Sequence, residues 1–115
     1  PDLFHSLCLE PRERAAADYL RGMGASGLGV EAAARTAAVL STGAEGAIPL
    51  KEGYAAAMAA QNTSYACVEK NIRSMVGKLQ AGACGEYQAL MGGLPAERPS
   101  NELFLRRLAR RILEW

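Results

Sequence analysis

The chain has 115 residues, half of them hydrophobic, and a formal net charge of +1, which is the size and composition of one soluble domain with a single core. It lacks the run of about 18 apolar residues that a membrane-spanning helix needs. It also lacks the basic region and apolar stretch of a secretory signal. We therefore expect a cytoplasmic protein without a membrane partner.

The cysteines and the usual catalytic motifs exclude several classes of site. Cys8, Cys67 and Cys84 are widely spaced without a C-x-x-C pair, and His5 is the one histidine, so neither a zinc site nor a disulfide framework is expected. The chain has no G-x-S-x-G and no phosphate-binding G-x-x-x-x-G-K. We expect no enzyme activity, no metal and no cofactor, and we expect each cysteine to be buried as a small hydrophobic residue.

The composition favours helices throughout. Alanine, the strongest helix former, occurs in runs at residues 15–17 and 55–57. Residues 1–10 show no clean period, and we assign them to a linker or a short added segment. Residues 11–115 are predicted to form a single all-α domain, a compact bundle of about five to six helices.

Two helices are predicted in the first part of this domain. The first covers residues 11–23, with Pro11 at the first helical position and glycines after its end. The second covers residues 27–41, and Glu31 and Arg35 are spaced to pair on its outer face. The residues of this second helix that are available to the core are Leu28, Ala32, Ala33, Val39 and Leu40.

Residues 50–79 contain two amphipathic helical patterns joined by only Asn62, Thr63 and Ser64. Asn62 tolerates the left-handed conformation of a tight turn, and Thr63 or Ser64 can cap the following helix. Such a short joint is typical of a helix-turn-helix, whose second helix lies in the DNA major groove.

The second helix of this pair has two distinct faces. Its apolar stripe consists of Val68, Ile72, Met75, Val76 and Leu79, and it should point into the protein. The opposite face, which could touch DNA, contains Tyr65, Glu69, Lys70, Arg73, Ser74 and Gly77.

The charge is divided unevenly along the chain. Residues 1–67 carry five basic and seven acidic side chains, a net charge of −2, whereas residues 68–115 carry eight basic and five acidic ones, a net charge of +3. A local basic surface is what neutralises phosphates. Lys78 and the arginines of the last helix would add attraction that does not depend on DNA sequence.

The last part of the domain is predicted to be a connecting segment followed by a final helix. Residues 82–93 are too rich in glycine for a long helix, although Tyr87, Leu90 and Met91 could form a brief helical turn. Ser100 can cap the last helix. Its apolar side consists of Phe104, Leu105, Leu108, Ile112 and Trp115, and Arg106, Arg107, Arg110 and Arg111 form a basic flank that suits solvent or a partner protein equally well.

In their order along the chain, these features resemble the C-terminal effector domain of the stage-zero sporulation protein A family. The resemblance rests on the glycine-containing junction at residues 23–29, Tyr54, the run at residues 62–73, Gly82, and residues 99–104 before the final helix. It covers most of the chain and implies a six-helix domain whose helix-turn-helix reads a promoter element. In the family this domain follows a phosphorylatable receiver, and no receiver lies within these 115 residues.

The outward face of the second motif helix and the resemblance together indicate which residues contact DNA. The residues predicted at the interface are Ser64, Cys67, Glu69, Lys70, Arg73, Ser74, Lys78, Ser100 and Asn101. Glu69, Lys70 and Arg73 match polar recognition-helix positions, Ser64 the start of that helix, and Ser100 and Asn101 the polar cap of the last helix. The chain departs from the family pattern twice, with Cys67 in place of a base-reading arginine and Ser74 in place of a histidine. Loss of a bidentate contact to guanine would change the target sequence.

Two other interpretations stay open. The charged face could be an ordinary solvated one, in which a pair between Glu69 and Arg73 contributes only about 0.3 kcal/mol. The domain could also be a helical protein interaction module that has lost DNA recognition, as Cys67, Ser74 and the alanine-rich first motif helix suggest. Double-stranded DNA is the favoured partner, with RNA polymerase subunits and a second copy of the chain on DNA as further candidates.

Overall fold

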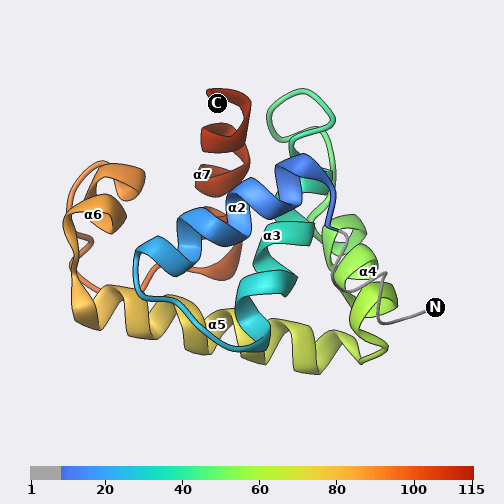
Figure 1. The fold of residues 1–115 in the computed structure, drawn as a ribbon, viewed down its shortest axis with the longest axis horizontal. Helices are drawn as coiled ribbons and strands as arrows, with labels where there is room; N and C mark the ends of the chain where they lie inside the picture. The colour runs from blue at the N-terminus through green and yellow to red at the C-terminus, as the bar shows by residue number, and fades with distance from the viewer. Residues whose placement is uncertain (1–8) are drawn as a thin grey trace.

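The computed structural model describes residues 9–115, which form six α-helices and no β-strand. This arrangement confirms the predicted all-α fold. The helices are α2 (Pro11–Gly22), α3 (Leu28–Leu40), α4 (Leu50–Gln61), α5 (Tyr65–Gly82), α6 (Gly85–Met91) and α7 (Asn101–Leu113) (Figure 1). Within this range no helix is long and apolar enough to cross a bilayer.

The helix α3 is the centre of the fold. It packs against α2, α4, α5 and α7, and every residue from 32 to 38 is buried. Small alanine side chains on several sides of α3 let four helices approach it. The long helix α5 runs along the base of the molecule in Figure 1, with α4 at its start and α6 at its end.

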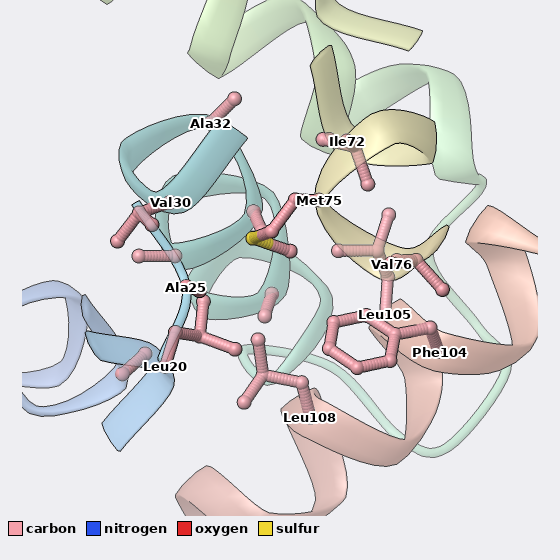
Figure 2. Close-up of a cluster of buried hydrophobic side chains, with 14 of the residues drawn as sticks. Leu20, Ala25, Val30, Ala32, Ile72, Met75, Val76, Phe104, Leu105 and Leu108 are labelled. Atoms are coloured by element: carbon pink, nitrogen blue, oxygen red, sulfur yellow. The ribbon is translucent and has the colours of Figure 1, made fainter. Parts of the chain in front are cut away.

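The core is a single cluster built mainly from α2, α3, α5 and α7 (Figure 2). The predicted apolar stripes of α5 and α7 are confirmed, apart from Trp115. Their buried members are Val68, Ile72, Met75, Val76, Leu79, Phe104, Leu105, Leu108 and Ile112. Because the first five of these side chains are buried on one face of α5, the opposite face of that helix is exposed to solvent.

Two glycines let α3 approach its neighbours closely. A Cβ atom added to Gly29 would lie 2.5 Å from the carbonyl oxygen of Asn71 on α5. On α4, a Cβ atom on Gly53 would lie 2.6 Å from Cγ2 of Thr36, whose hydroxyl donates a hydrogen bond of 3.3 Å to the Gly53 carbonyl. The position of the α4–α5 pair on α3 therefore depends on the absence of side chains at these two sites.

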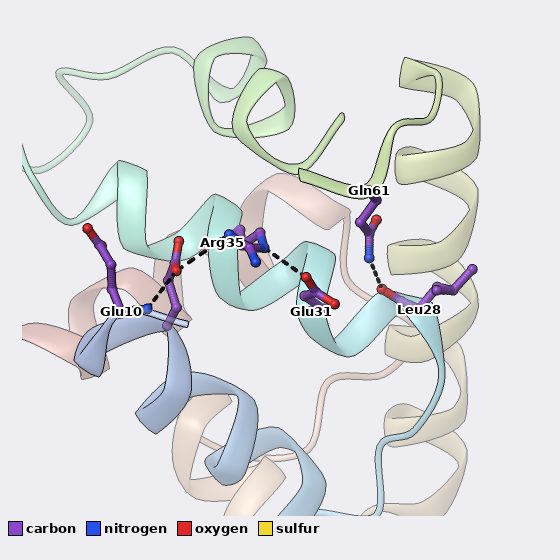
Figure 3. Close-up of polar contacts among 6 residues, drawn as sticks. Glu10, Leu28, Glu31, Arg35 and Gln61 are labelled. Atoms are coloured by element: carbon purple, nitrogen blue, oxygen red, sulfur yellow. Dashed lines mark hydrogen bonds and ion pairs between the residues drawn. The ribbon is translucent and has the colours of Figure 1, made fainter. Parts of the chain in front are cut away.

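The prediction that Glu31 and Arg35 lie on an outer face is wrong, because α2 covers that side of α3. Arg35 is only 7% exposed. Its Nε donates to Glu31 at 2.9 Å, and its Nη1 lies 3.6 Å from Glu13 of α2 (Figure 3). Glu13 also accepts a hydrogen bond of 3.0 Å from the backbone N–H of Glu10. These contacts form a buried ionic cluster that joins α2 to α3.

Three apolar residues predicted in the core lie at least partly outside it. Leu28 is 64% exposed, because it occupies the first position of α3, where Gly29 and not Leu28 faces α5. Val39 is only half-buried. Trp115 follows the end of α7 and is 53% exposed, with its ring edge-on to Tyr19 at 5.3 Å.

The segment predicted as a connection contains a short helix, α6, of seven residues. Tyr87, Leu90 and Met91 are its buried residues, as the sequence predicts. The ends predicted for α2, α3 and α7 lie within two residues of the observed ends, whereas α5 continues three residues past the predicted end at residue 79, to Gly82. Of the segment predicted as a linker at residues 1–10, residues 1–8 lie outside the described range.

Candidate nucleic-acid interface

The turn between α4 and α5 is tight and fully specified by local hydrogen bonds. Asn62 ends α4 in the left-handed conformation, with φ 51° and ψ 55°, and the N–H of Thr63 donates to the carbonyl of Met58 at 3.1 Å. The hydroxyl of Ser64 caps α5 by accepting a hydrogen bond of 3.2 Å from the N–H of Cys67. Both expectations for this turn are confirmed, so α4 and α5 are joined by the predicted three-residue turn.

The end of α4, just before the turn, is also tied to α3. The side-chain amide of Gln61, the last residue of α4, donates to the carbonyl of Leu28 at 3.1 Å (Figure 3). Leu28 begins α3 and precedes Gly29, which packs on the backbone of α5. The first residues of α3 therefore contact both the last residue of α4 and the backbone of α5 at Asn71.

Asn101 at the start of α7 joins three helices. Its Nδ2 donates to the hydroxyl of Tyr54 on α4 at 3.1 Å and to the carbonyl of Glu69 on α5 at 3.0 Å. This amide nitrogen, predicted to face DNA, is thus engaged inside the fold. The neighbouring Ser100 is exposed, and its hydroxyl caps α7 by accepting from the N–H of Leu103 at 3.1 Å. Asn101 orients α5, which is a supporting role for any interface on that helix.

The outward face of α5 presents a strip of exposed residues opposite its buried stripe. We call this the exposed strip, and its members are Ala66, Cys67, Lys70, Arg73, Ser74 and Lys78. Among the described residues Lys70 has no ion-pair partner, whereas Arg73 lies 3.3 Å from Glu69. That pair is 47% and 41% exposed, so water screens it and Arg73 can exchange Glu69 for another anion at little cost.

Cys67 is exposed, and the expectation of a buried thiol is wrong for it. It lies in the first turn of α5 on the outward side. Hydrogen bonds from the hydroxyls of Ser64 and Thr63 lower the pKa of this thiol. Cys84, before α6, is partly buried, as expected for a small hydrophobic residue. Cys8 lies outside the described residues.

Two hollows flank α5. One lies beside the glycine-rich turn between α2 and α3, where Ser74 and Lys78 line it together with residues 24–29. The other lies between α4, α5 and the start of α7, where Arg73 and Arg98 line it together with Ser100. The structure therefore places a cation from α5 in each hollow.

Arg98 is a residue that the sequence analysis left without a role. It belongs to the connection between α6 and α7, and its Cδ lies 3.5 Å from the position of a Cβ on Gly77 of α5. Arg98 lies over α5 because the chain between α6 and α7 passes across that helix, which is a contact between segments distant in the sequence. The one local signal was a cation just before the Pro99 and Ser100 that start the last helix.

Comparisons of the chain with protein-family models, with curated proteins and with solved structures found no match. Within residues 9–115, no group of three or more His, Cys, Asp or Glu side chains could hold a metal ion. The features of this chain that indicate a function are therefore the exposed strip and the two hollows beside it.

Proposed function

We propose that this domain is a sequence-specific DNA-binding transcription regulator and that α5 is its recognition helix. The observation that carries the proposal is the exposed strip, which presents Lys70, Arg73 and Ser74 on the helix that follows a three-residue turn. The major groove, about 12 Å wide, admits one α-helix. With its buried stripe on the protein, α5 can enter the groove with these side chains leading.

Each polar residue of the strip suits a specific contact. Arg73 and Lys70 can donate to the O6 and N7 acceptors of guanine or to phosphates. The carboxylate of Glu69 can accept from the amino group of a cytosine once Arg73 turns to DNA. Cys67 and Ser74 are short, so they read a base edge more weakly than an arginine or a histidine would. The preferred sequence should therefore differ from that of the sporulation family.

The resemblance to the stage-zero sporulation protein A family supports this proposal, since that family uses an equivalent helix pair to bind promoters. On this proposal the domain has no enzymatic role. Its main partner is double-stranded DNA, and RNA polymerase subunits and a second copy of the chain bound to the same promoter are further partners.

A salt-titrated binding experiment tests the proposal. The wild type and Arg73→Ala are titrated into a fluorescent duplex pool of random sequence, and selection from that pool then supplies the preferred site. The logarithm of the affinity should fall linearly with the logarithm of the salt concentration. Arg73→Ala should bind the selected site about 10-fold or more weakly than the wild type. Arg14→Ala removes an equal charge from the exposed side of α2 and should bind like the wild type. Binding that does not depend on salt, or equal affinities of Arg73→Ala and Arg14→Ala for the selected site, would contradict the proposal.

A protein interaction module is the second candidate. The observation in its favour is a set of large apolar side chains that are exposed to solvent, namely Leu28, Tyr65, Leu94, Leu103, Leu113 and Trp115. Single exposed apolar residues are common on soluble domains, so this observation is weaker than the exposed strip. An interaction module would show neither the salt dependence nor the loss on Arg73→Ala.

A further inference from the structure

The two hollows lie on opposite sides of the exposed strip of α5. Successive residues of an α-helix are rotated by about 100°, so Arg73 and Lys78 project from α5 about 140° apart. Arg73 reaches the hollow shared with α7, and Lys78 reaches the hollow beside the glycine-rich turn. A helix that lies in a groove has one phosphate strand on each of its flanks.

Arg98 lies beside this strip, and the residues before and after it in the chain are both fixed to the fold. On one side of it, the carbonyl of Pro95 accepts a hydrogen bond of 2.7 Å from the side chain of Gln80 on α5. On the other side, Pro99 is buried and Ser100 caps α7. The connection between α6 and α7 is thus fastened to α5, and the Arg98 stem rests over Gly77.

The positive charge of Arg98 is not neutralised by a carboxylate of the described residues. The two carboxylates that line its hollow are those of Glu69 and Glu102, and they pair with Arg73 at 3.3 Å and with Arg106 at 3.1 Å. Among the described residues Arg98 itself has no ion-pair partner, and its side chain is exposed. The guanidinium can therefore take an external anion without breaking a contact of the fold.

Lys78 has the same properties on the other flank. It is exposed, and within residues 9–115 it forms no ion pair. The glycine-rich turn beside it is held close to α5, because Gly29 packs on the backbone of Asn71. The residues of that turn which line the hollow are Gly, Ala and Ser apart from Leu28, so Lys78 stays exposed beside them.

We propose that Arg98 and Lys78 bind backbone phosphates on opposite strands of the duplex, one on each side of the groove that α5 enters. This inference rests on the proposed function and adds to it a residue outside the helix-turn-helix. Phosphate contacts of this kind fix the register and orientation of a protein on DNA without reading its sequence. The pair would hold α5 along the groove from both flanks, while Lys70 and Arg73 reach the bases.

The first test measures the salt dependence of binding for Arg98→Ala, Lys78→Ala and the double variant. The probe is the duplex recovered by selection, about two helical turns long. Each lost phosphate contact should reduce the slope of log affinity against log salt by about 0.9, and the double variant should lose about twice that. Arg98→Lys should keep the wild-type slope, because it keeps the charge. Arg14→Ala serves again as the charge-matched control.

The second test assigns the strands. Single phosphates of the same duplex are replaced by neutral methylphosphonates, first on one strand and then on the other. Replacement at the contacted position should weaken the wild type but not the variant that already lacks the matching cation, and the positions for Arg98→Ala and Lys78→Ala should lie on different strands.

The outcomes separate this inference from the proposed function. If Arg98→Ala keeps the slope of Arg14→Ala while Arg73→Ala still loses affinity, the inference is overturned and the proposed function stands. If both contacts map to one strand, the placement of α5 between the two strands is overturned. If the wild type shows no salt-dependent binding to any duplex, both proposals fall together.

Discussion

Replacement of Gly53 by alanine tests the close packing of α3 and α4. In an exposed helix this change stabilises a protein by about 1 kcal/mol, because alanine is the better helix former. At Gly53, however, the new Cβ would lie 2.6 Å from Cγ2 and 3.1 Å from the carbonyl oxygen of Thr36. Thr36 is fully buried, so neither atom can move away without shifting α3 or α4.

The expected size of the effect follows from these two opposing terms. Overpacking of a core costs about 1–3 kcal/mol, which exceeds the gain in helix propensity of about 1 kcal/mol over most of its range. Gly77 of α5 is the matched control, since a Cβ there would make only an ordinary contact of 3.5 Å with Arg98. Gly53→Ala should therefore be about 1–3 kcal/mol less stable than Gly77→Ala.

Urea unfolding followed by far-ultraviolet circular dichroism gives this difference, provided that the two variants have equal m-values. Thermal midpoints offer a second measure, with a shift of about 4–8 °C for each kcal/mol in a domain of this size. Equal stabilisation by the two substitutions would refute the reasoning, because it would mean that α3 and α4 have room for a methyl group at their contact.

Four further predictions concern polar groups. Arg35→Met leaves two glutamates without their cation in the α2–α3 interface and should lower the free energy of unfolding by about 3 kcal/mol; a loss below about 1 kcal/mol in urea would show that the cluster is solvated. Asn101→Ala removes two hydrogen bonds and should cost about 1–3 kcal/mol, with the loss visible in the same assay. Burial raises the pKa of Tyr54 above its ordinary value, which is about 10. The stability that protonated Tyr54 contributes is therefore fully present below pH about 10 and is lost as the pH rises above it, because the tyrosine of the unfolded chain loses its proton first. In urea unfolding, the free energy of unfolding of Tyr54→Phe should fall less at alkaline pH than that of the wild type, and an equal fall would contradict this. Bound duplex should slow alkylation of Cys67 by iodoacetamide but not that of Cys84, as measured by peptide mass spectrometry, and unchanged Cys67 labelling would count against DNA on α5.

The sequence was sufficient for features set by local chemistry. The positions of α4, α5 and α7 follow from apolar residues at helical spacing, which burial in the core then confirms. Asn62 and Ser64 reveal the turn because a left-handed residue and a hydroxyl cap are requirements of neighbouring backbone atoms. For the same reason the outward face of α5 could be derived from its inward one.

Features that depend on contacts between distant segments could not be predicted in this way. Glu31 and Arg35 have the spacing of an exposed pair, and only the position of α2 over α3 buries them. Asn101 has the sequence of a surface cap, yet its amide meets Tyr54 and Glu69, which lie on other helices. Arg98 likewise reaches α5 only because the chain between α6 and α7 passes over Gly77.

The two hydrogen bonds donated by Asn101 have a consequence for how the domain is assembled during synthesis. Both α4 and α5 precede α7 in the chain and are synthesised first, so for a time they lack the amide that joins them to α7. A chain cut by a protease just before Asn101 would keep every residue of α5 and lose the amide that joins α4 and α5 to α7. The arrangement of these three helices is therefore complete only after Asn101 has been added to the growing chain.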